Sequence, residues 1–145
     1  LMSIPVELPD LQAKTGEYTW AFLLTVRPDA TPHLVSLSTL WHDDGAEPAL
    51  LMSVSAGTAR NATAGSVVTL CYPPLDHDGY SLIVDGTASV HDGDPPAGVD
   101  PIPEGKALLR FAPTGAVLHR SAAPGFANSA TGCANDCLPV DASTT

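Results

Sequence analysis

Positive charge is scarce in this sequence. Its 145 residues include six lysines and arginines against sixteen aspartates and glutamates, which gives a formal net charge of -10. Proteins bind nucleic-acid backbones and anionic membrane surfaces mainly through basic residues. The composition therefore argues against both kinds of partner, and it makes each basic residue a candidate contact for an anionic ligand.

Long apolar runs and an export signal are also missing. No stretch reaches the roughly 18 apolar residues of a membrane span. The N-terminal residues have neither the basic start nor the apolar core of a signal peptide. We therefore expect a cytoplasmic protein without a membrane anchor.

Cysteine is rare, and the count of three is odd. An odd count excludes a complete disulfide framework. Cys71 lies in an apolar segment and is predicted to be a buried thiol. Cys133 and Cys137 lie in a tail of small polar residues, where no nearby histidine or third cysteine completes a metal site. Two free thiols are favoured over a metal site there, and we predict no metal centre.

The composition indicates a globular β-rich protein. Hydrophobic residues make up 44% of the chain and charged residues 15%, while 14 prolines and 12 glycines favour many turns and few long helices. Apolar segments bounded by turn residues predict strands at 18–26, 33–42, 49–55, 67–72, 81–91, 107–112 and 116–121. Gly86 predicts a bulge or bend within its strand. The segment Pro113-Thr114-Gly115 predicts a tight turn, and residues 92–105 predict a long loop.

Six or seven short strands with one or two short helices are typical of a small antiparallel β-barrel. A β-sandwich is the alternative architecture. Residues 18–26 are largely apolar on both faces, so we expect this strand to be buried on both sides. We place the domain at residues 1–121, followed by a small and polar tail at residues 122–145.

The segment after the third predicted strand suggests an anion site. Ala56 and Gly57 are small, so a ligand can approach the backbone there. Thr58 is predicted to cap the helical turn that follows, which leaves N–H groups at its start for a phosphate. Arg60 adds a fixed charge and a fork of donors. An ordinary strand-to-helix turn with a capping threonine and a surface arginine fits the same spacing.

A family resemblance is carried by several segments in a fixed order. They are Ala21–Val26, Thr31–Leu37, Leu50–Ser55, Thr58–Ala62, Val67–Leu70, Val84–Ala88 and Arg110–Arg120. With these segments the chain resembles the pyridoxamine 5'-phosphate oxidase-like family of flavin-binding split β-barrels. The resemblance implies a mostly β, antiparallel split barrel that forms a homodimer and binds two flavins in clefts between the subunits.

The same resemblance implies the cofactor and the residues that hold it. FMN is the most frequent cofactor of the family, and the deazaflavin F420, FAD or haem is bound in some branches. The implied phosphate contacts are Thr58, Arg60 and Asn61, and the implied ring and ribityl contacts are Ser36, Ser38, Ser53 and Ser55. Two departures stand out, because Arg60 is the one basic residue in its turn and the loop 92–105 replaces a helix.

The implied function is that of a flavin-dependent oxidoreductase with a small-molecule substrate. No catalytic acid or base is identified, which suits chemistry performed by the cofactor. FMN is favoured over F420 because the longer and more acidic tail of F420 needs more basic contacts than this chain offers. The alternatives are an F420-dependent reductase, a dimer that holds flavin or haem without turnover, and a structural dimer that has lost its cofactor.

Overall fold

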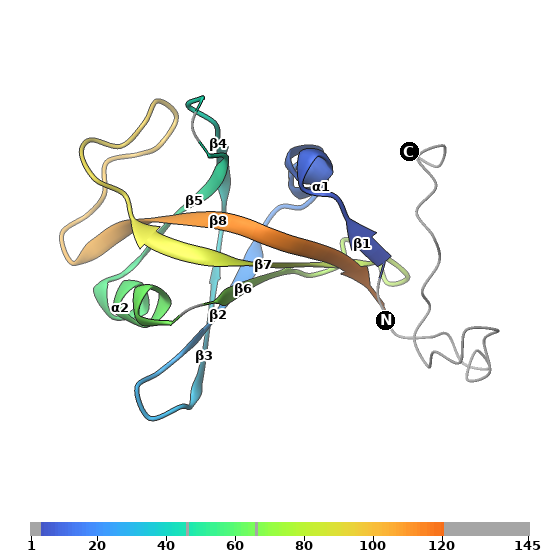
Figure 1. Ribbon diagram of the computed structural model, residues 1–145, viewed down its shortest axis with the longest axis horizontal. Helices are drawn as coiled ribbons and strands as arrows, with labels where there is room; N and C mark the ends of the chain where they lie inside the picture. The colour runs from blue at the N-terminus through green and yellow to red at the C-terminus, as the bar shows by residue number, and fades with distance from the viewer. Residues whose placement is uncertain (1–3, 46, 66, 121–145) are drawn as a thin grey trace.

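The computed structural model describes residues 4–45, 47–65 and 67–120 (Figure 1). The strands are β1 (Ile4–Val6), β2 (Ala21–Val26), β3 (Pro32–Leu37), β4 (Leu40–His42), β5 (Ala49–Ser55), β6 (Val68–Tyr72), β7 (Ser81–Val90) and β8 (Lys106–His119). The helices are a 3-10 turn (Leu8–Asp10), α1 (Leu11–Gly16) and α2 (Ala56–Ala64). The predicted tail at 122–145, with Cys133 and Cys137, lies outside the described residues.

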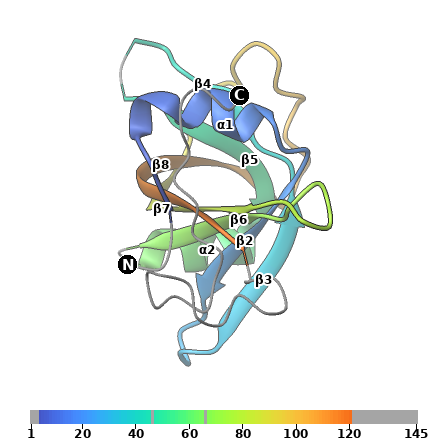
Figure 2. The ribbon, with the colours of Figure 1, turned by 90° about the vertical axis from the view of Figure 1, so that its right-hand side faces the viewer.

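All of these strands belong to one antiparallel sheet. Its order is β3-β2-β6-β7-β8-β5-β4, and β1 pairs with β8 outside this path. Figure 2 shows that the sheet curls around its core and that α1 crosses one end. A single curled sheet confirms the predicted barrel and excludes the sandwich of two packed sheets. Its interior is closed by fully buried side chains, including Leu23, Leu70, Val84, Leu109 and Phe111.

The two short α-helices confirm the predicted helix content. α2 contacts β7, β2, β5 and β8, and it buries the small side chains of Ala59 and Ala62 in the core. α1 buries Leu11 and ends at Gly16, as the prolines before it and the low helix propensity of glycine favour. Within the described ranges, no helix is long and apolar enough to cross a membrane.

The predicted tight turn at residues 113–115 is wrong. This segment lies inside β8, which continues from Lys106 to His119 and pairs with β7 along its length. The register shifts at Asp85 and Gly86, where Asp85 faces Gly115 and Gly86 faces Pro113. Thr114 is therefore the extra residue of a β-bulge opposite Asp85 and Gly86, and the bulge expected at Gly86 is confirmed.

Three further details differ from the sequence prediction. The predicted strand 33–42 is divided into β3 and β4, and Ser38 and Thr39 connect the two. Residues 4–6, for which no strand was predicted, form the edge strand β1. β2 is buried on one face within this protomer, because Leu24 and Val26 on its other face are 38% and 56% exposed.

The bulge generates a prediction about stability. A Cβ atom on Gly86 would lie 2.4 Å from the Ala112 carbonyl oxygen and 2.7 Å from the Phe111 ring. The backbone carbonyl and the buried ring can move away only at a large cost in energy. Gly86→Ala is therefore expected to lower the free energy of unfolding by about 2–3 kcal/mol, measured by urea unfolding. Gly115→Ala is the matched control, because nothing lies within 4 Å of a Cβ there. Equal losses in the two variants would contradict a clash at Gly86 as the cause.

Candidate functional site

The helix α2 begins directly where the strand β5 ends. Ser55 keeps an extended backbone and forms the N-cap, and its hydroxyl oxygen accepts the N–H of Thr58 at 3.2 Å. The same hydroxyl donates to the Thr58 Oγ1 at 3.0 Å, and Thr58 is 2% exposed. The prediction that Thr58 caps the helix is therefore wrong, because the capping residue lies three positions earlier at the end of the strand.

Arg60 folds back over the first turn of α2. A Cβ atom on Gly57 would lie 3.7 Å from the Arg60 Nη2 and 4.0 Å from the Ser55 Oγ. Two N–H groups in the first turn of α2 have partners: that of Ala56 donates to the Gly105 carbonyl at 3.2 Å, and that of Thr58 donates to the Ser55 hydroxyl. The Gly57 N–H lies between them and takes part in neither bond. A guanidinium beside this donor, at the positive end of a helix, provides the chemistry that binds a phosphate.

Lys106 is a second cation at this position, and the sequence analysis missed it. The pairing of β5 with β8 places Lys106 directly opposite Ser55. Directly paired residues of antiparallel strands point to the same face of the sheet, so the Lys106 side chain lies on the face that carries Ser55. No local pattern around residue 106 indicates this contact, since it depends on the register of two strands far apart in the sequence.

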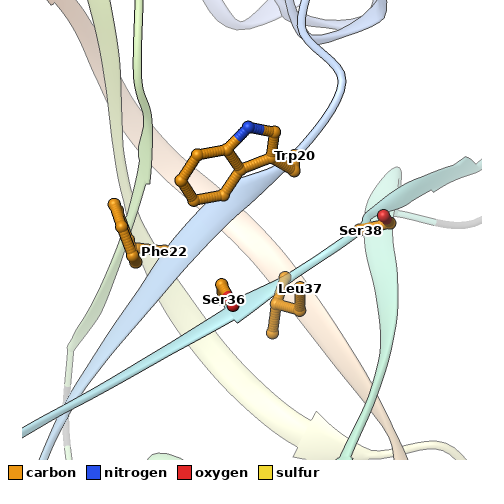
Figure 3. Close-up of a pocket in the computed structure, with 5 residues that line it drawn as sticks. All are labelled: Trp20, Phe22, Ser36, Leu37 and Ser38. Carbon is orange, nitrogen blue, oxygen red and sulfur yellow. The ribbon is translucent and has the colours of Figure 1, made fainter.

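Ser36 and Ser38 line a hollow of about 390 Å³ together with Trp20, Phe22 and Leu37. Figure 3 shows the rings of Trp20, which directly precedes β2, and of Phe22 on β2, together with Ser36 on β3 and Ser38 in the connection to β4. The two rings meet edge to face, with centroids 4.7 Å apart. We call this space the aromatic hollow; it combines an apolar wall of two aromatic rings with two hydroxyl groups.

Ser38 also lines a second hollow of about 400 Å³, and Ser53 lines it from β5. Residues 98–103 form its opposite wall, and we call it the loop hollow. Ser53 and Ser55 point to the same face of β5, because they are two residues apart on one strand. The structure thus joins the serines predicted from the sequence into a path from the aromatic hollow to the start of α2.

Two predicted contacts are placed differently. The Thr58 hydroxyl is buried and bonded to Ser55, so it faces away from a ligand. Asn61 is half-buried on α2 and is not among the described residues that line either hollow. Arg60, by contrast, is exposed at the start of the helix.

A hydrogen bond to the core fixes the connection between β3 and β4. The hydroxyls of Thr39 and Tyr72 lie 2.7 Å apart, and Tyr72 is 1% exposed. Burial raises the pKa of Tyr72 to about 12, so its hydroxyl stays protonated at neutral pH. Because Thr39 follows Ser38 in the chain, this bond anchors the residue that both hollows share.

Residues with reactive side chains are few around the hollows. Cys71 is half-buried rather than buried, and desolvation raises the pKa of its thiol, which disfavours the reactive thiolate. Across residues 4–45, 47–65 and 67–120, no three His, Cys, Asp or Glu side chains come together as a metal site. The arrangement is therefore suited to binding an anionic organic molecule and does not by itself supply an acid or a nucleophile.

Comparison with known proteins identifies relatives and the fold. No protein-family model matches the chain. It is 36% identical over 139 residues to the uncharacterised proteins Mb0449c of Mycobacterium bovis and MT0457 of Mycobacterium tuberculosis, and each alignment covers 92% of this chain and 93% of the relative.

Two solved structures share the split-barrel fold. A Listeria innocua protein provisionally identified as a pyridoxamine 5'-phosphate oxidase has a TM-score of 0.59 and 16% identity, covering 77% of this chain and 98% of that one. The haem storage protein HutZ of Vibrio cholerae has a TM-score of 0.56 and 16% identity, covering 77% and 94%. At this level of identity the likeness concerns the fold.

The Ser55 cap is directly testable. Ser55→Ala removes the acceptor of the Thr58 N–H, so we expect a loss of about 1 kcal/mol in the free energy of unfolding. Ser53→Ala is the control on the same face of the same strand, and it is expected to change that free energy by less than about 0.5 kcal/mol. Urea unfolding of both variants measures the difference, and an unaffected Ser55→Ala variant would remove the cap from the description of the site.

Proposed function

Because the chain belongs to the family of the mycobacterial proteins Mb0449c and MT0457, and has the split-barrel fold of pyridoxamine 5'-phosphate oxidase-like proteins, we propose that it is a flavin-dependent oxidoreductase. The observation that carries the proposal is the position of Arg60. Its guanidinium lies against the first turn of α2, at the end of a path of serine hydroxyls.

The residues present fit a flavin phosphate. Arg60 and the Gly57 N–H would hold it, and Lys106 would add a second positive charge from β8. Ser36, Ser38 and Ser53 would donate to the polar edge of the ring and to the ribityl chain. When bound, the flavin supplies the hydride or electron transfer, and the protein positions it and limits access of water.

FMN is our proposed cofactor, with F420 as the alternative. The described site offers Arg60 and Lys106 as cations, and the neighbouring loop 92–105 carries acidic residues but no lysine or arginine. The acidic tail of F420 would extend from the phosphate into this negative surrounding, whereas FMN ends at the phosphate. A small-molecule substrate completes the proposed reaction, and no nucleic acid takes part.

Haem binding without turnover is less well supported. Haem iron needs an axial side-chain ligand such as histidine or cysteine. No histidine or cysteine is found among the described residues that line the aromatic hollow or the loop hollow. The likeness to HutZ therefore supports the fold and not, for this chain, the ligand.

We also propose that two copies associate through the outer face of β2 and β3. The register pairs Phe22 with Ser36 and Leu24 with Leu34 on this face. Leu24 and Leu34 are 38% and 55% exposed. The strands β2, β3 and β6 contain no Asp, Glu, Lys or Arg, so copies with a charge of -10 each can meet here without charged groups in contact. The aromatic hollow opens on the same face, since Phe22 and Ser36 line it.

Mutation of Arg60 tests the cofactor site. Arg60→Ala is expected to weaken FMN binding by about 1.5–3 kcal/mol, the size of a charge-assisted hydrogen bond, while the unfolding curve stays unchanged. Titration of cofactor-free protein with FMN and with F420, followed by flavin fluorescence, gives the affinities, and FMN is expected to bind wild type more tightly. Arg27→Ala is the control, because Arg27 bonds within the β2–β3 turn. Unchanged affinity of Arg60→Ala for both cofactors would refute the assignment.

Light scattering tests the dimer. At micromolar concentration the protein is expected to be a dimer, with an interface of about 2,000 Å² or more in total. Leu24→Asp places a charge in the proposed interface and should yield monomers. Leu75→Asp is the control, since Leu75 is 57% exposed but lies in the loop between β6 and β7. A monomeric wild-type protein, or dissociation by both variants alike, would contradict this interface.

A further inference from the structure

The loop 92–105 forms one wall of the loop hollow. Residues 98–103 line it without interruption, and they face Ser38 and Leu40 from the β3–β4 side and Ser53 from β5. In Figure 1 the loop extends from the end of β7 beside β4 and β5 before the chain enters β8. The hollow is therefore bounded by a serine-bearing side and by a loop side with different chemistry.

Hydrogen bonds hold this loop in place at both ends. The N–H of His91 donates to the Leu108 carbonyl at 2.8 Å, and the N–H of Lys106 donates to the Pro103 carbonyl at 3.1 Å. The Gly105 carbonyl accepts the N–H of Ala56 at 3.2 Å, which ties the loop to the first residue of α2. The loop also contains four prolines, Pro95, Pro96, Pro101 and Pro103, each of which fixes a backbone angle. The wall is thus a defined surface that can select a ligand.

The charge on this wall has one sign. The loop carries Asp92, Asp94, Asp100 and Glu104 and contains no lysine or arginine. Asp100 is the charged residue among the described residues that line the hollow. Leu40, Ile102 and Leu108 supply the apolar part of the lining. A carboxylate beside apolar side chains favours a ligand with an apolar body and a donor or positive group, and it repels anions.

We propose that the loop side of the loop hollow, across from the serines assigned to the flavin, is the substrate subsite, and that it takes uncharged or cationic organic molecules and rejects carboxylates and phosphates. The apolar part of the substrate lies against Leu40, Ile102 and Leu108, and an N–H or O–H group of the substrate donates to the Asp100 carboxylate. As a substrate subsite it rests on the proposed flavin function. Positive and negative charge then lie at different ends of the proposed site, because the cations Arg60 and Lys106 hold the cofactor phosphate and Asp100 faces the substrate.

Three matched probes test the selection by charge. Benzylamine, benzyl alcohol and benzoate present one ring with a positive, neutral or negative group. The full chain, with isoleucine methyl groups labelled for NMR, reports binding at Ile102, while Ile4 and Ile83 serve as references elsewhere in the fold. Titrations followed by the Ile102 methyl signal are expected to show about 5-fold higher affinity for benzylamine than for benzyl alcohol, the effect of one exposed charge pair. Benzoate is expected to bind more weakly than either.

Two variants distinguish the effect of the Asp100 carboxylate from the effect of the overall negative charge of the loop. Asp100→Asn is expected to remove the preference for benzylamine over benzyl alcohol. Glu104→Gln removes one charge from the same loop at a residue outside the hollow lining, and it is expected to keep most of that preference. Benzoate binding as tightly as benzylamine, or an unchanged preference in Asp100→Asn, would overturn the proposal.

Addition of FMN distinguishes this inference from the proposed function. If FMN binds and benzylamine still shifts Ile102, both proposals are supported. If FMN displaces benzylamine, the hollow belongs to the cofactor and the subsite is refuted. If FMN does not bind at all while the charge preference persists, the flavin function fails and the charge-selective hollow stands.

Discussion

The strand β8 is the element on which the rest of the structure depends. It forms backbone hydrogen bonds with β7 along most of its length, with β5 at its beginning and with β1 at its end. The bulge opposite Gly86 allows this long strand to bend, so that its beginning can close the barrel against β5. Closure against β5 sets the register that places Lys106 opposite Ser55, so the geometry of the proposed anion site depends on the sheet.

The distribution of charge bears on how an acidic chain could bind the proposed FMN. A net charge of -10 repels an approaching phosphate over distances of about a Debye length, ~8 Å at physiological ionic strength. Local donors must then outweigh this repulsion. Arg60 lies against the first turn of α2, where the helix adds its own positive end, and Lys106 lies opposite Ser55 on the neighbouring strand. The same distribution leaves β2, β3 and β6 without charged side chains, which frees one face for association.

The sequence predicted features that depend on neighbouring residues and failed where distant pairing decides. The Gly86 bulge could be predicted, because a glycine within an apolar strand often marks a bulge or a close approach of another backbone. Residues 113–115 have a composition that suits a turn and a bulge equally, and only the pairing with Gly86 distinguishes them. Ser55 and Thr58 both carry a capping hydroxyl, and the end of β5 decides which one caps.

The candidate site was predicted in part for the same reason. Ser36, Ser38 and Ser53 line the hollows, and Ser55 lies on the same face of β5 as Ser53, since period-two alternation fixes the face of a strand. Lys106 could not be found, because its place beside Ser55 depends on the register between β5 and β8. Whether these residues bind FMN stays a prediction.

The late position of β8 in the chain has a consequence for synthesis on the ribosome. β2, β3, β6 and β7 can pair with one another as soon as residue 90 is available. β5 has only the short strand β4 as a partner until residues 106–111 emerge, and β1 has none among the described strands before residues 116–118. The nascent chain therefore carries the apolar strand β5 with one edge open from the time it is made until residues 106–111 emerge, an interval in which pairing with another chain competes with folding.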